Sequence, residues 1–349
     1  MHVLFLASAL LVGCLLAVQA SVNLQLNKAV GTPYGASTLQ LSVATALLAL
    51  LAVAAGAIGA VRLAPGVPFW HLLGGLASPL YITSGILLFP RLGALAAAGL
   101  FVTGQMFASL GLDLFGLLGI ARKPLSAGIA LGALAVLAGI TVIIRGQRPA
   151  LPAQSPPPPA PRVTAGPAPG GAAGVPARGG TATVTAPAPA AVRRTGNLGQ
   201  TGWILLGIVA GAVLPVQGAV NAALREDIHQ PVTTAMISFA VATITIAVVL
   251  AVLLATRRTP RPRFAPLRTM PWWGWLGGAC AAAYVTATFT LIPTIGAATT
   301  VALTVTGQQV ASAVIDNYGL LRLPRRPLTT PRLSGLALLI AGSVLVQLT

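Results

Sequence analysis

The chain has 349 residues, of which 7% are charged and 56% are hydrophobic. Soluble globular domains contain about 25% charged residues, so this composition excludes an ordinary soluble protein and is typical of a bilayer protein. The net charge of +17 could suggest nucleic-acid binding, but the Lys and Arg residues lie between long apolar runs rather than in one basic patch. We therefore expect the lipid bilayer, and not a nucleic acid, to be a partner.

Apolar stretches of the length that a spanning helix needs, about 20 residues, occur ten times along the chain. They predict an all-α integral membrane protein with ten transmembrane helices. The predicted spans are residues 3–22, 37–61, 69–89, 93–112, 126–145, 203–222, 232–255, 272–292, 296–315 and 333–348.

The first of these stretches ends in Ala17-Val18-Gln19-Ala20, which is similar to a signal-peptidase site. No positively charged residue precedes its apolar run, although signal peptides normally carry one there. We therefore expect this helix to be retained.

Residues 146–200 are rich in Pro, Ala and Gly and contain several Arg. Such a segment cannot bury enough apolar surface to fold, and we predict a disordered linker. It divides the chain into a first five-helix transmembrane repeat, residues 1–145, and a second, residues 201–349.

The two halves match each other residue by residue. Gln19 and Asn23 match Gln217 and Asn221 at an offset of 198. After a loop that is longer by five residues, the offset becomes 203 and then stays constant. This second offset pairs Trp70 with Trp273, Gly74-Gly75 with Gly277-Gly278, Pro90 with Pro293, Gly104-Gln105 with Gly307-Gln308, Asp113 with Asp316, and Gly139 with Gly342.

An odd number of helices in each half means that the second half starts on the opposite side of the membrane. Inverted repeats of this kind are typical of transporters, with the substrate site between the halves near the bilayer midplane. One side of the predicted topology carries only Arg62, Arg122, Lys123 and Arg225, and the other side carries the remaining seventeen of the 21 Lys and Arg residues. Because cytoplasmic loops are enriched in Lys and Arg, we predict a cytoplasmic linker and two external termini.

Six repeat-matched amide side chains are candidates for the substrate path. Gln and Asn four positions apart share one helix face, where they could hydrogen-bond either a substrate or a neighbouring helix. Both interpretations remain open for the set, which is Gln19, Asn23, Gln105, Gln217, Asn221 and Gln308. The paired glycines more simply permit close helix crossing.

Asp113 and Asp316 are the only acidic residues that the repeat matches. An acid in a low-dielectric environment favours its protonated form, so these two residues could couple solute movement to protons. Asp is also a frequent turn former at helix ends, and we favour a role in ordering the loop that follows each residue.

No nucleophile and base, paired carboxylates or metal-ligand spacing occurs in the sequence, and His2, His71 and His229 stand far apart. We expect no enzyme activity, no catalytic residue, no metal and no cofactor. His229, next to Glu226 and Asp227, is predicted to be solvated.

Four sequence runs resemble the YdcZ-like branch of the drug/metabolite transporter (DMT) superfamily. They are Gln217-Gly-Ala-Val-Asn221, the Pro271–Gly278 run, Pro293-Thr-Ile-Gly-Ala297 and the Gly307–Gly319 run. That branch contains five-helix bacterial inner-membrane proteins, and this chain resembles a fused form with five plus five helices. The resemblance implies export of a small molecule across the inner (plasma) membrane, with no catalytic residue to transfer.

The sequence thus predicts a secondary transporter in the bacterial inner membrane that works by alternating access between two inverted halves. An ion channel of the inverted-repeat type and a non-transporting membrane scaffold remain alternatives. The substrate is not indicated, and a homodimer is kept open.

Overall fold

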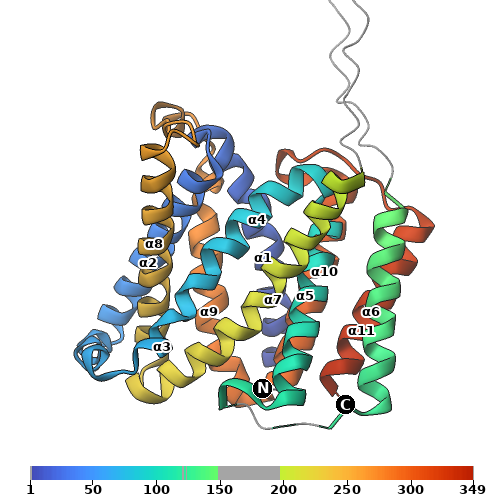
Figure 1. The fold of residues 1–349 in the computed structure, drawn as a ribbon, viewed down its shortest axis with the longest axis horizontal. Helices are drawn as coiled ribbons and strands as arrows, with labels where there is room; N and C mark the ends of the chain where they lie inside the picture. Colours follow the sequence, from blue (N-terminus) through green and yellow to red (C-terminus); the bar gives the residue numbers. More distant parts are fainter. Residues whose placement is uncertain (1, 120–121, 123, 148–196, 349) are drawn as a thin grey trace, which may run out of the picture.

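The computed structural model describes residues 2–119, 122, 124–147 and 197–348, so most of the predicted linker lies outside the described residues. Every regular element in these ranges is a helix, as predicted, and Figure 1 shows the long helices packed side by side. The long helices are α1 (His2–Val30), α2 (Pro33–Ala54), α4 (Ala77–Leu92), α5 (Ala94–Phe115), α6 (Ala127–Arg145), α7 (Asn197–Ile228), α8 (Pro231–Ala255), α9 (Leu276–Ile295), α10 (Ala297–Tyr318) and α11 (Thr330–Leu348).

Short helical turns connect several of the long helices. These turns are η1 (Ile58–Gly66), α3 (Phe69–Leu72), η2 (Leu73–Leu76), η3 (Leu117–Gly119), η4 (Ala265–Arg268), η5 (Trp272–Trp275) and η6 (Leu320–Arg322).

Eight of the described helical segments are long and apolar enough to cross a membrane. They are α1, α2, the continuous stretch from α3 to α4, α5, α6, α7, α8 and α11. The other two long helices, α9 and α10, have 20 and 22 residues and contain four threonines each. The chain is thus a multi-pass membrane protein, and the residues that the structure describes contain eight candidate spans, two fewer than the sequence predicts.

The bounds of two predicted spans need correction. The first helix extends to Val30 rather than residue 22, because its polar second half is buried among other helices: Gln19, Asn23 and Gln25 are only 5%, 2% and 6% exposed. The second helix ends at Ala54 rather than residue 61. Gly56 follows it with a φ of +66°, a left-handed conformation that ends a helix and that glycine adopts without steric cost.

Helices of the two halves pack against each other reciprocally. α1 packs on α9 and α10, and its repeat-matched counterpart α7 packs on α4 and α5. α2 pairs with α8 at one end of the bundle and α6 pairs with α11 at the other (Figure 1). In the same view α1 rises from the N-terminus at the bottom, whereas α7 descends from the top.

Glycines lie where these helices approach most closely. A Cβ atom on Gly13 of α1 would lie 2.0 Å from the carbonyl oxygen of Thr304 on α10, and one on the matching Gly211 of α7 would lie 2.1 Å from that of Phe101 on α5. Gly75 and Gly278 are also crowded, against α8 and α2 respectively. The interpretation of the paired glycines as helix-crossing residues is therefore confirmed for Gly75 and Gly278, and Gly13 and Gly211 are a further matched pair of this kind.

Candidate functional site

A cavity of about 790 Å³ lies inside the bundle. Its walls come from α1, α4 and α5 of the first half and from α7 to α11 of the second half. Cavities of about 300–1,000 Å³ hold small molecules, so this volume is sufficient for a solute with one or more rings.

Five of the six predicted amide side chains line this cavity, namely Gln19, Gln105, Gln217, Asn221 and Gln308. Asn23 is not among the described lining residues. Its Oδ1 atom packs on Gly277, where a Cβ atom would lie only 2.1 Å away. Asn221 packs on Gly74 in the same manner, at 2.3 Å, but it also faces the cavity. The two matched asparagines thus share a packing contact and differ in their access to the cavity.

Some of the amide side chains in the cavity wall have hydrogen-bond partners for their N–H groups. Gln217 Nε2 donates a hydrogen bond to Ser78 Oγ at 2.8 Å, and Gln308 Nε2 donates one to Tyr81 Oη at 3.2 Å. Among the described residues, no donor reaches the buried carbonyl oxygens of Gln19, Gln217 and Asn221. These oxygens are enclosed by protein atoms, and Asn221 Oδ1 packs on Gly74, so they do not face the open part of the cavity in this conformation.

Two tyrosines in the cavity wall were missed by the sequence reasoning. Tyr81 on α4 and Tyr284 on α9 both line the cavity, and the Tyr81 ring packs on Phe101 with 4.7 Å between ring centroids. The signal was present, because the offset of 203 pairs Tyr81 with Tyr284. The same test that found Gln105 and Gln308 would have found them.

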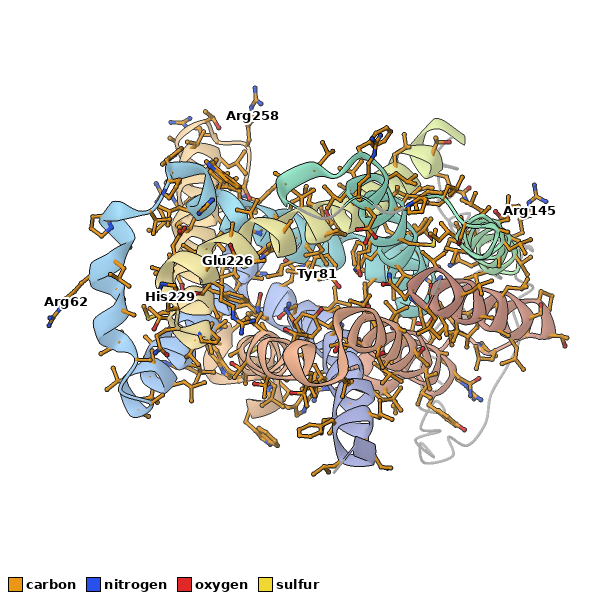
Figure 2. The ribbon with its side chains drawn as sticks, turned by 90° about the horizontal axis from the view of Figure 1, so that it is seen from below. Arg62, Tyr81, Arg145, Glu226, His229 and Arg258 are labelled. Atoms are coloured by element: carbon orange, nitrogen blue, oxygen red, sulfur yellow. The ribbon has the colours of Figure 1, made fainter. Side chains whose placement is uncertain are left out.

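The cavity reaches the surface beside the C-terminal end of α7. Arg225, Glu226 and His229 line it there, and Glu226 and His229 are exposed. Figure 2 shows Tyr81 near the middle of the bundle and Glu226 and His229 on the α7 segment to one side. His229 is exposed as predicted, but it also contributes to the cavity mouth. The mouth lies at the end of the molecule where both chain termini are drawn (Figure 1).

Next to the mouth, His71 of α3 and Asp227 of α7 share a hydrogen bond between Nδ1 and Oδ2. The Trp70 ring stands edge-on to His71 with 3.9 Å between centroids. No sequence pattern indicates a pairing of His71 with Asp227, because 156 positions separate them.

Asp316 lies outside the described cavity wall and joins three parts of the chain. Its carboxylate accepts hydrogen bonds from the backbone N–H groups of Ala94 and Leu95, at 2.8 and 3.2 Å, and pairs with Arg332 at 2.7 Å. The N–H groups at a helix start lack partners within the helix and favour a negative charge, so Asp316 caps α5.

Arg332 links this cap to the loop after α10. It donates hydrogen bonds to the carbonyl oxygens of Arg326 and Pro327, at 2.7 and 3.1 Å. Burial lowers the pKa of the Arg326 guanidinium, while the nearby Asp316 charge opposes that shift. The predicted loop-ordering role of Asp316 agrees with these contacts, and the cap on α5 is an additional contact that the sequence did not indicate.

Asp113 differs from Asp316 although the repeat matches them. Asp113 is half-buried, whereas Asp316 is 1% exposed. Position 129, which matches Arg332 at the offset of 203, is an isoleucine. The first half therefore has no arginine at the position that neutralises Asp316 in the second half.

Comparison with protein families gives a match over both halves. The family model described as "Putative inner membrane exporter, YdcZ" matches residues 4–142 and again residues 202–345. The chain belongs to the YdcZ family. As a YdcZ-family member with at least eight apolar helices, it is a multi-pass protein of the inner membrane, and its family is one of membrane exporters.

No curated protein matches the chain in sequence. A solved structure described only as "Crystal structure of protein" matches with a TM-score of 0.51 and 16% identity, covering 99% of this chain and 96% of that one. At this identity the likeness concerns the fold alone. It extends over the whole bundle, so the arrangement of both halves of this YdcZ-family chain recurs in an experimental structure.

Proposed function

We propose that the protein is a secondary transporter that exports a small molecule across the inner membrane by alternating access between two inverted halves. The observation that carries the proposal is the cavity of about 790 Å³ between the halves, which is lined by repeat-matched Gln105 and Gln308 and by Gln19 and Gln217. A site between repeats that is open at one end is what an alternating-access carrier requires.

The proposal includes ten spans, with α9 and α10 as the two additional ones. Polar residues of α10 such as Thr300, Thr304 and Gln308 line the cavity, so the helix can cross the bilayer with its polar face away from lipid. The reciprocal packing of α1 and α7 and their opposite directions in Figure 1 support inversion of the second half.

Orientation follows from the charges. With seventeen of the 21 Lys and Arg residues on the side of the linker, we propose that residues 146–200 are cytoplasmic. The cavity mouth beside Glu226 and His229 would then face outward, which corresponds to the outward-open state of an exporter after release of its substrate.

Transport can be tested before the substrate is identified. Proteoliposomes are loaded with a bacterial metabolite extract, and mass spectrometry measures which compounds leave faster than from protein-free vesicles. Saturable, gradient-dependent efflux would support a carrier, and conductive flux at channel rates would indicate a pore instead. If no compound or ion leaves under any gradient, the scaffold alternative is correct.

A matched pair of variants connects this flux to the cavity. We expect Asn221→Ala to reduce efflux by about five- to 150-fold, because losing a hydrogen bond to the solute at the site costs about 1–3 kcal/mol. Asn23→Ala, which removes the same packing contact on a glycine but not from the cavity wall, should retain efflux. Equal losses in both variants, with equal thermal stability, would show that the asparagines act only between helices.

Proton coupling is a secondary part of the proposal. The ion pair with Arg332 and the cap on α5 engage Asp316 structurally, which leaves Asp113 as the better candidate. If Asp113 couples protons, Asp113→Asn should abolish efflux driven by a pH gradient and preserve exchange of substrate between equal pH values. Efflux that still follows the pH gradient would exclude this role.

A further inference from the structure

The end of the bundle opposite the cavity mouth is held together by contacts between the two halves. Asp316, at the end of α10, accepts hydrogen bonds from two backbone N–H groups at the start of α5. Arg326, in the loop after α10, donates hydrogen bonds to the carbonyl oxygens of Pro90 and Arg91, at 3.2 and 3.1 Å. The turn between α4 and α5 is thus bound to the second half at this end.

The matching elements of the two halves have the same local backbone. Gly93 precedes α5 with a φ of +82°, and Gly296 precedes α10 with a φ of +86°. The glycine that ends each of these helices has a φ of +64° in both halves, and Asp113 and Asp316 stand three residues before it. Each half therefore has the same turn before this helix and an aspartate at the end of it.

The two ends of the bundle differ in whether these parts meet. Gly93 is buried, and a Cβ atom on it would lie 2.8 Å from Asp316 Oδ2. Gly296 is exposed, and apart from its chain neighbours no atom of the described residues lies within 4 Å of such a Cβ atom. Among the described residues, Asp113 has no hydrogen-bond or ion-pair partner. The aspartate cap is therefore formed at the closed end and is absent at the open end.

We infer that Asp113 caps the start of α10 when the cavity mouth closes, in the way that Asp316 caps the start of α5 in this structure. Leu112, next to Asp113, and Thr300, in the first turn of α10, both line the cavity, so a contact between these parts would narrow its open end. The first N–H groups of a helix lack partners within the helix and favour a carboxylate. The inference rests on the proposed alternating access, in which inverted repeats form matching contacts at either end in turn.

The cap at the mouth would be the weaker of the two caps. Arg332 neutralises Asp316, whereas the matching position of the first half is Ile129. Asp113 would lose hydration on closure without gaining an opposite charge at that position. The mouth should therefore open more readily than the opposite end, which agrees with the open mouth of this conformation.

Spin labels at the mouth measure this closure. In a chain whose two native cysteines are replaced by Ala, labels are attached to Phe115→Cys, at the end of α5, and Thr294→Cys, before α10, because both positions are exposed. Pulsed electron spin resonance on the full-length protein in nanodiscs records the distribution of distances between the labels. We expect two populations, one with the longer distance of this structure and one with a shorter distance that the cap produces.

Substitutions at Asp113 show whether the cap holds the shorter distance. Asp113→Leu should lower the ratio of the shorter to the longer population by about five- to 30-fold, which corresponds to about 1–2 kcal/mol for a lost helix cap. Asp113→Asn should retain the shorter population, because the Asn side-chain oxygen caps a helix about as well as that of Asp. Persistence of the longer population in Asp113→Leu shows that this variant is folded.

A third variant weakens the opposite end. Arg326→Ala removes two hydrogen bonds that hold the closed end, so it should increase the share of the shorter distance at the mouth. The inference is overturned if Asp113→Leu leaves the ratio unchanged, if Asp113→Asn lowers it as much as Asp113→Leu, or if only the longer distance occurs even with Arg326→Ala.

This test and the transport test can fail separately. A shorter distance that depends on Asp113, combined with no efflux of any compound, would contradict the transporter proposal and retain the cap. Saturable efflux combined with a distance ratio that Asp113→Leu does not change would contradict the cap and retain the transporter.

Discussion

At the residue scale, Asp316 and Arg332 show how one ion pair connects distant segments. Their side chains are only 1% and 3% exposed, and together they engage the start of α5 and the loop before α11. A buried charge is tolerated only when it is paired and hydrogen-bonded, and each of these two charges compensates the other.

Removal of one of the two charged side chains should therefore lower the stability of the protein. We expect Asp316→Leu to destabilise the protein by about 3–5 kcal/mol, because Arg332 would remain buried without its counter-charge and α5 would lose its cap. Thermal unfolding of the purified protein, followed by loss of the monodisperse fraction, measures the effect.

The double variant with Arg332→Ile, the residue type that the first half has at this position, provides the control. It should recover part of the loss, because no charge is then left unpaired. A double variant less stable than Asp316→Leu would contradict this account and would indicate that Arg332 stabilises the loop by itself.

At the element scale, close crossing of helices depends on residues without side chains. The backbone of α7 at Gly211 approaches α5 so closely that a Cβ atom would lie 2.1 Å from a carbonyl oxygen, and backbone atoms cannot move aside as a flexible side chain can. In membranes, where lipid tails are as apolar as leucine, such close packing is a main source of helix association.

This crossing can be tested on one helix with its own control. Gly211→Ala should lower stability by about 1–3 kcal/mol through overpacking, with reduced transport because α7 carries Gln217 and Asn221. Gly202→Ala lies on the same helix with open space around the added atom, and it should be neutral or slightly stabilising. Equal thermal stability of the two variants would show that α5 and α7 separate easily.

At the scale of the whole molecule, the distribution of positive charges and the open end of the cavity indicate the same direction of solute release. The end of the bundle that carries few Lys and Arg residues is the end where the cavity opens beside Glu226. If cytoplasmic loops carry the positive charges, a solute leaves this conformation toward the periplasm.

Single cysteines measure this orientation in intact cells. In a chain with Cys14 and Cys280 replaced by Ala, we expect a membrane-impermeant maleimide to label Gln230→Cys, in the exposed loop between α7 and α8, and not Ser155→Cys in the predicted linker. Both should react after the membrane is permeabilised. The reverse pattern would invert the topology and make the observed cavity inward-open.

The sequence by itself determined that the protein is helical and membrane-embedded, that its halves are matched, and which amides are worth testing. The hydropathy of each stretch and the constant spacing between matched residues can be read from the sequence alone. Membrane insertion depends on local runs of apolar residues, and a duplication preserves the order of the residues that it copies. Five of the six amides, including Gln105 and Gln308, do line one cavity.

Only the tertiary structure decided how matched residues differ. Asn23 and Asn221 have the same local sequence setting, yet only Asn221 faces the cavity, and Asp316 caps a helix more than 200 positions away in the chain. The physical reason is that burial, pairing and cavity access depend on which helices meet in space. Two copies of one pattern can therefore pack differently when their neighbours, such as Ile129 and Arg332, are not the same.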